Sequence, residues 1–156
     1  MVAPNNLSAA PAERTLVLTR MFDAPRTLVF KAWSTPEHLA NWFGPTNFTL
    51  PFCEVDFRVG GNYRLCMRSP DGKEYWVHGV YREIVEPERI VFTWERDGAD
   101  DEHAGHTLVT ITLEDVAGKT RLTLHQATFD STEIRDGHGQ GWTQAFGRLD
   151  QYLKRG

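Results

Sequence analysis

The chain has 156 residues, of which 40% are apolar and 24% are charged, and this composition is typical of one soluble globular domain. Its 17 Lys and Arg residues against 21 Asp and Glu residues give a net charge of -4, which supplies no positive field for a phosphate backbone or an anionic lipid surface. No run approaches the ~20 apolar residues of a membrane span, and the amino-terminal residues do not resemble a signal peptide. We therefore predict a cytoplasmic protein with neither nucleic acid nor membrane as a partner.

The first third of the chain predicts a tail, a strand and two short helices. Residues 1–12 mix Pro, Ala, Asn and Ser without periodicity, so we expect a mobile tail there and a single domain over residues 13–156. Residues 14–22 are rich in β-branched and apolar types, as in a first strand. Asp23 and Thr35 each precede a proline by one or two residues and are predicted to cap two short helices that end before the Gly-Pro pair at 44 and 45.

Turn residues and alternating side chains then predict a series of antiparallel hairpins. The two glycines at 60 and 61 suit a three-residue loop that pairs Val55 with Leu65. The Ser-Pro-Asp-Gly sequence at 69–72 is typical of a turn that pairs Leu65 with Val77. These registers place the apolar side chains of all three strands on one face of the sheet.

The next hairpin places one acid among apolar groups. A turn at residues 86–89 aligns Tyr81 with Trp94 and Glu83 with Phe92, so the carboxyl group of Glu83 is expected on the apolar face. Desolvation there would raise its pKa and make it a candidate general base or ligand anchor. The alternative is a position near the end of the sheet, where the same carboxylate accepts hydrogen bonds from loop amides.

The last hairpin and a long helix complete the predicted domain. Ile111 is expected opposite Leu122, and the helix is expected from Asp130, with Glu133 as its capping-box partner. Its apolar stripe consists of Ile134, Trp142, Ala145, Phe146, Leu149 and Leu153. The predicted fold class is α+β: a curved, antiparallel, seven-stranded sheet that grips a long C-terminal helix, with two short helices at one side.

The predicted interior is rich in aromatic residues, which form 12% of the chain. We expect part of this surface to line a cavity, while the remainder fills the core. The expected cavity residues are Trp42, Phe43, Phe57, Tyr63, Met67, Tyr75, Tyr81, Glu83, Phe92, Trp94, Trp142 and Phe146. Gly137, Gly139 and Gly141 precede Trp142 in the helix, at a cost of ~1 kcal/mol each relative to alanine, and indicate either a kink or close backbone approach or a mobile gate to that cavity.

Motifs for cofactor chemistry are missing from the sequence. It has no G-x-S-x-G nucleophile motif and no phosphate-binding glycine loop, so we expect no cofactor. His103 and His106 stand in an acidic loop with a spacing that metal ligands can have, but loops of this composition are usually solvated and we expect no metal site.

Several short motifs, in order along the chain, carry a family resemblance. They are Thr-Arg-Met-Phe-Asp-Ala-Pro-Arg at 19–26, Trp-Phe-Gly-Pro at 42–45, Asp-Phe-Arg-Val-Gly-Gly at 56–61, Pro-Asp-Gly at 70–72 and Gly-Trp at 141–142. With them, residues 14–154 resemble the family homologous to the activator of the Hsp90 ATPase, in the START-like (SRPBCC) superfamily. The resemblance implies the helix-grip fold, with a deep apolar cavity between sheet and helix.

Three kinds of function follow as hypotheses. The leading one is a binding protein for a small apolar or aromatic molecule. The second is an enzyme similar to the aromatic cyclases of the superfamily, using Glu83 and a tyrosine for proton transfer. The third is a protein-interaction domain with a chaperone as partner, because the resemblance includes a eukaryotic co-chaperone that joins this domain to another.

Overall fold

The computed structural model describes residues 12–97 and 106–155. The predicted tail, apart from its last residue, and most of the acidic loop, including His103, lie outside these described residues. The elements in chain order are η1 (Ala12–Arg14), β1 (Leu16–Phe22), α2 (Arg26–Lys31), α3 (Pro36–Leu39), β2 (Thr49–Val55), β3 (Asn62–Arg68), β4 (Glu74–Val85), β5 (Arg89–Arg96), β6 (Thr107–Val116), β7 (Lys119–Ala127) and α4 (Thr132–Lys154).

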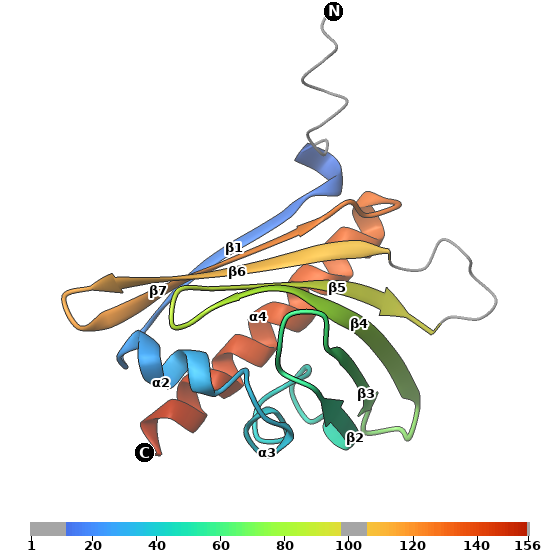
Figure 1. Ribbon diagram of the computed structural model, residues 1–156. Helices are drawn as coiled ribbons and strands as arrows, with labels where there is room; N and C mark the ends of the chain where they lie inside the picture. The colour runs from blue at the N-terminus through green and yellow to red at the C-terminus, as the bar shows by residue number, and fades with distance from the viewer. Residues whose placement is uncertain (1–11, 98–105, 156) are drawn as a thin grey trace, which may run out of the picture.

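The strands form one antiparallel sheet in the order β1-β7-β6-β5-β4-β3-β2. Figure 1 shows the long helix α4 running across one face of the curved sheet, with α2 and α3 beside its C-terminal part. Because the sheet has one apolar face and α4 has one apolar stripe, each buries the other. The predicted α+β helix-grip architecture is confirmed.

The strand registers test the turn assignments. The turn at 69–72 pairs Leu65 with Val77, as predicted. The β2–β3 hairpin, by contrast, pairs Val55 with Tyr63 rather than with Leu65, because its loop is longer than three residues. A shift of two residues keeps each side chain on its face of the sheet, so Tyr63 and Leu65 are still buried.

The β6–β7 hairpin shows the same kind of difference. Ile111 lies opposite Leu124, not Leu122. The cause is a two-residue turn at Ala117 and Gly118, both with positive φ angles (55° and 85°), a geometry that matches the twist of paired strands.

The predicted position of Glu83 is wrong. The pairing of β4 with β5 is irregular between Tyr81 and Glu83, so that Tyr81 lies opposite Phe92 and Glu83 lies opposite Val91. An extra residue of this kind moves every following side chain to the other face. The Glu83 side chain is 47% exposed and accepts a hydrogen bond of 2.7 Å from Arg89 Nε, in an ion pair at the surface.

Of the three predicted helix caps, only Thr35 is the observed N-cap residue. Thr35 Oγ1 accepts a hydrogen bond from the His38 amide at 3.2 Å, as its capping pattern predicts. Asp23 is not the cap of α2, which follows Pro25 without a side-chain cap. In α4 the cap is Ser131 instead of Asp130, because Ser131 Oγ reaches the Ile134 amide at 3.1 Å.

The densest part of the core surrounds Trp33. Its ring centroid lies 4.8 Å from that of Trp42, 6.0 Å from Trp142 and 6.4 Å from Phe146. Trp42 is fully buried, and its Nε1 donates to the carbonyl of Ala32 at 3.0 Å. This cluster joins the short helices to α4 and closes one end of the space under the sheet. No helix in the described part of the chain is both long and apolar enough to cross a bilayer.

Candidate functional site

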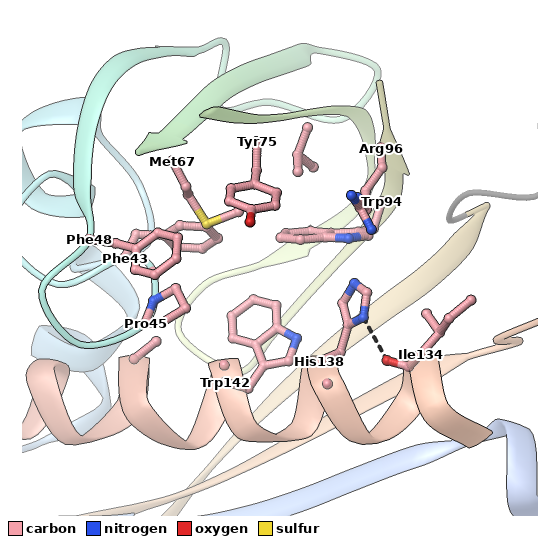
Figure 2. A pocket seen from close by; sticks show the side chains of 15 residues that line it. Phe43, Pro45, Phe48, Met67, Tyr75, Trp94, Arg96, Ile134, His138 and Trp142 are labelled. Atoms are coloured by element: carbon pink, nitrogen blue, oxygen red, sulfur yellow. Dashed lines mark hydrogen bonds between the residues drawn. The ribbon is translucent and has the colours of Figure 1, made fainter. Parts of the chain in front are cut away.

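A pocket of about 300 Å³ lies at the other end of this space, between the N-terminal half of α4, strands β3 to β5 and the segment after α3. Figure 2 shows α4 as its floor and the strands on the opposite side. The lining residues are Phe43, Gly44, Pro45, Phe48, Met67, Tyr75, Val77, Trp94, Arg96, Ile134, Gly137, His138, Gly141, Trp142 and Ala145. Most of these side chains are aromatic or aliphatic.

Small residues of α4 leave the room for this pocket. A Cβ atom added at Gly137 would meet no atom within 4 Å, and one at Gly141 would meet only Pro45 Cγ, at 3.6 Å. The helix continues without a break through both positions. The glycines therefore shape a space beneath the sheet, with α4 remaining helical around them.

A single arginine fixes the segment that forms one wall. Arg148 Nη1 of α4 donates to three successive carbonyl oxygens, those of Phe43 at 3.3 Å, Gly44 at 3.0 Å and Pro45 at 3.1 Å. Burial lowers the pKa of Arg148, although an arginine remains charged at neutral pH. Gln144 adds a fourth link, because its Oε1 accepts from the Thr46 amide at 2.9 Å.

A buried polar chain orients Trp142, the largest side chain of the floor. Its Nε1 donates to Gln126 Oε1 at 2.9 Å, and Gln126 Nε2 donates to Thr107 Oγ1 at 2.8 Å. Gln126 is fully buried. Each polar atom of the chain has a partner, so the arrangement holds the indole ring in one orientation.

Four polar side chains also face the pocket: Tyr75, Trp94, Arg96 and His138. His138 Nδ1 lies 2.9 Å from the carbonyl oxygen of Ile134. Since a carbonyl oxygen can only accept, Nδ1 carries the hydrogen and Nε2 keeps its lone pair. Burial lowers the pKa of His138, the hydrogen bond to the Ile134 carbonyl raises it in part, and the nearby Arg96 charge lowers it; the net shift is downward, so the ring is neutral at pH 7.

The indole of Trp94 is the unusual member of this group. The residue is 4% exposed, and its Nε1 is a buried donor with no acceptor among the described residues. Buried donors are rarely left without a partner in native proteins, and such a group in a pocket indicates a role beyond packing. The only other buried side-chain donor of this kind in the described residues is Trp33 Nε1.

The structure separates the predicted cavity residues into several groups. Phe43, Met67, Tyr75, Trp94 and Trp142 line the pocket. Tyr63, Tyr81 and Phe92 line a neighbouring void of only about 20 Å³, Trp42 and Phe146 are buried in the core, Phe57 packs against Phe30 and Tyr81, and Glu83 is at the surface.

Other lining residues were missed by the sequence reasoning, although two of them carried a usable signal. Arg96 follows Trp94 by two residues in a strand, which places both side chains on one face. His138 precedes Trp142 by four residues in a helix, which again gives a shared face. Pro45 and Phe48 follow the short helices in a segment without regular structure, where no periodicity reveals orientation.

Metal ligands are not gathered anywhere in the described residues, where no group of three or more His, Cys, Asp and Glu side chains could hold an ion. His106 lies 3.3 Å from Glu95 Oε1. Its predicted companion His103 is outside the described residues.

The comparison with known families decides the relationship. The family model described as "Activator of Hsp90 ATPase homolog 1-like protein" matches residues 23–154, a range that includes all the lining residues of the pocket named above. The chain belongs to this family. No curated protein matches it.

Solved structures from bacteria share the fold of this activator of Hsp90 ATPase homolog 1-like chain. A Chromobacterium violaceum protein is 30% identical, with a TM-score of 0.80 and coverage of 90% of this chain and 96% of that one. An AHSA1 protein from Silicibacter pomeroyi is 27% identical, with a TM-score of 0.81 and coverage of 90% and 97%. A Nitrosomonas europaea protein is 25% identical, with a TM-score of 0.78 and coverage of 93% and 97%.

Proposed function

We propose that the protein binds a small, mainly apolar molecule in the pocket between α4 and strands β3 to β5. The observation that carries this proposal is the pocket itself: about 300 Å³ with a lining that is largely aromatic and aliphatic and has a few polar groups. Small-molecule sites have this composition, and their volumes begin at roughly 300 Å³. Family membership supports the coarser statement that this is a ligand-binding or interaction domain.

The pocket walls support the proposal because they are fixed by internal contacts. Arg148 holds the carbonyl groups of residues 43–45, and Gln126 orients Trp142. A preformed site avoids the entropy cost of ordering its side chains when a ligand arrives. From the predicted set we propose Phe43, Met67, Tyr75, Trp94 and Trp142 as ligand contacts.

The two alternative hypotheses lack comparable support. The cyclase-like enzyme was inferred from Glu83, and that carboxylate is paired with Arg89 away from the pocket. An interaction domain needs a contiguous apolar surface patch. The exposed large apolar side chains among the described residues are spread over four elements and one loop: Val17, Met21, Leu28, Val59, Val85 and Leu108.

A pair of helix variants tests the proposal. Gly137→Leu places a side chain into the pocket. Gly147→Leu adds the same bulk to the same helix at a position that does not line the pocket. Both positions have open space for a Cβ atom. The probes are 2-naphthol, indole and decanol, with binding measured by thermal shift and isothermal titration. A bound probe stabilises the fold by ~2.7 kcal/mol at one hundred times its dissociation constant.

We expect wild type and Gly147→Leu to bind at least one probe with similar affinity, and Gly137→Leu to lose most of that affinity while still folding. Equal binding by Gly137→Leu would place the ligand elsewhere. If none of the three probes bound wild-type protein, the proposed function would be wrong. Native mass spectrometry of freshly purified protein then identifies the molecule carried over from the cell.

A further inference from the structure

We infer that the pocket takes an amphipathic carboxylic acid, whose apolar body lies against Trp94 and Trp142 and whose carboxylate pairs with the guanidinium of Arg96. This inference rests on the proposed binding function and adds the chemical class of the ligand. It follows from the charge, the hydrogen-bond donors and the volume of the pocket.

Among the described residues that line the pocket, the fixed charge is a single positive one. Arg96 is the only Lys, Arg, Asp or Glu of these described lining residues, and His138 is neutral. The chain as a whole has a net charge of -4, so a cationic pocket runs against the overall balance. Arg96 is exposed at the edge of this largely apolar pocket, so it attracts an anion as a partly solvent-screened cation.

Within residues 12–97 and 106–155, Arg96 has no carboxylate partner. Its neighbour Asp97 is occupied, with its carboxylate 2.8 Å from Arg64 and 2.6 Å from His78. The other neighbour, Glu95, lies 3.6 Å from His78.

Strand geometry directs Arg96 to the pocket. It lies opposite Val77 in the β4–β5 register, and Val77 also lines the pocket. The guanidinium carbon is 5.9 Å from the ring centroid of Tyr75, a cation–π contact that keeps the side chain at the pocket edge. Figure 2 shows Arg96 beside Trp94, with His138 on the facing helix.

Two polar groups around Arg96 can donate hydrogen bonds to a ligand, whereas His138 Nε2 can only accept one. The Trp94 Nε1 hydrogen has no acceptor among the described residues, and in Figure 2 the Tyr75 hydroxyl group points into the pocket. A carboxylate offers two oxygen atoms that accept from several donors, and a guanidinium binds it through parallel hydrogen bonds. A phosphate monoester would bring a second negative charge for which the lining residues provide no cation.

The test compares acids with their neutral amides in matched pairs. The pairs are 2-naphthoate with 2-naphthamide, indole-3-acetate with indole-3-acetamide, and decanoate with decanamide. Affinities are measured by isothermal titration for wild type, Arg96→Gln and Arg82→Gln. The last variant is the control, because Arg82 is an exposed arginine of β4 that does not line the pocket, and its replacement removes the same charge from the chain.

For wild type and Arg82→Gln, we expect the acid of at least one pair to bind about two- to fivefold more tightly than its amide, the range for a partly exposed ion pair. Arg96→Gln should bind acid and amide about equally, with an unchanged melting temperature. Added salt should weaken acid binding in wild type and leave amide binding unchanged.

The outcomes separate this inference from the proposed function. If amides bind as tightly as acids, or if Arg96→Gln retains the preference for acids, the inference is wrong while the binding function stands. If no acid and no amide binds, both are wrong. If the preference for acids disappears in Arg82→Gln as well, overall charge is the cause and the assignment to Arg96 fails.

Discussion

The two halves of α4 face the same sheet but meet it in different ways. The C-terminal half presents Phe146 and Leu149, both almost fully buried, and Phe146 contacts Phe22 edge to face at 6.2 Å. The N-terminal half presents Gly137 and Gly141 at the corresponding places, and there the pocket lies. The position of the hollow is therefore set by the size of the residues on one helix face.

The largest expected effect comes from removing bulk at the packed end. Phe146→Ala should lower the free energy of unfolding by ~3–5 kcal/mol, because it leaves a cavity in a closely packed cluster. Ile134→Ala is the comparison at the hollow end, where the side chain is only partly buried and lines existing space. Its cost should be below ~1.5 kcal/mol. Similar costs in urea unfolding would contradict the difference between the two halves.

A smaller effect is expected at Arg148, which links α4 to residues 43–45 in one wall of the pocket. Arg148→Met should lower the free energy of unfolding by ~1–3 kcal/mol, because partly buried carbonyl oxygens of residues 43–45 lose their common donor. It should also weaken probe binding, since the wall is no longer held. Arg155→Met, at the exposed end of α4, is the control and should change neither quantity. Unchanged binding by Arg148→Met would show that the wall holds without this contact.

Alanine in place of a glycine at the hollow end of α4 is expected to stabilise the protein. Gly137→Ala should raise the free energy of unfolding by up to ~1 kcal/mol, because alanine favours the helix and the new methyl group meets nothing within 4 Å. Gly139→Ala should gain less, since its Cβ would lie 3.2 Å from Leu16 Cδ1 and that side chain has to shift. Thermal unfolding measures both variants. A larger increase in stability for Gly139→Ala than for Gly137→Ala would mean that Leu16 of β1 moves aside at little cost.

The smallest effect concerns pH at the hollow end. Burial lowers the pKa of His138 in the folded protein, while the unfolded chain has the ordinary value of about 6.5. Below that pH the unfolded state binds the proton more readily, so the free energy of unfolding should fall as the pH decreases. The difference is ~1.4 kcal/mol for each unit by which the pKa is lowered.

Denaturant unfolding of His138→Gln at pH 7.5 and 5.5 tests this expectation. The variant should lose less stability between the two values than wild type does, because it has no imidazole at this position. The control His125→Gln removes an exposed histidine of β7 and should behave as wild type. If wild type and His138→Gln lost equal stability, the burial of His138 would have no titration consequence.

From the sequence, the side of the sheet that each side chain faces was easier to predict than the residue opposite it on the neighbouring strand. Shifts of two residues in the β2–β3 and β6–β7 hairpins left Tyr63 and Leu124 buried on the expected face, because alternation repeats every two residues. The irregularity after Tyr81 shifts the pairing by one residue, and one residue is enough to turn Glu83 outward. Nothing in the local sequence distinguishes that strand from a regular one.

The pocket was harder to predict than the fold for a related reason. The sequence identifies apolar residues that face inward, yet it does not say whether two such residues touch each other or leave room between them. Phe92 and Trp94 lie on the same strand face, but Phe92 packs against Trp33, Tyr63 and Tyr81, while Trp94 reaches the pocket. The glycines of α4 at positions 137, 139 and 141 were the one local signal for space, because their cost in a helix requires a reason.

The chain of indole rings under the sheet has an optical consequence. Trp42, Trp33, Trp142 and Trp94 follow one another with ring centroids 4.8, 6.0 and 5.5 Å apart, and Trp76, stacked under the Arg64 guanidinium, is in none of these ring pairs. Rings this close share excitation energy, so four of the five tryptophans emit as a coupled group. A molecule that touches Trp94 or Trp142 then changes the fluorescence of the whole group, including that of Trp42 in the core. The protein thus carries its own reporter of pocket occupancy, and Trp76→Phe would remove the separate background emission.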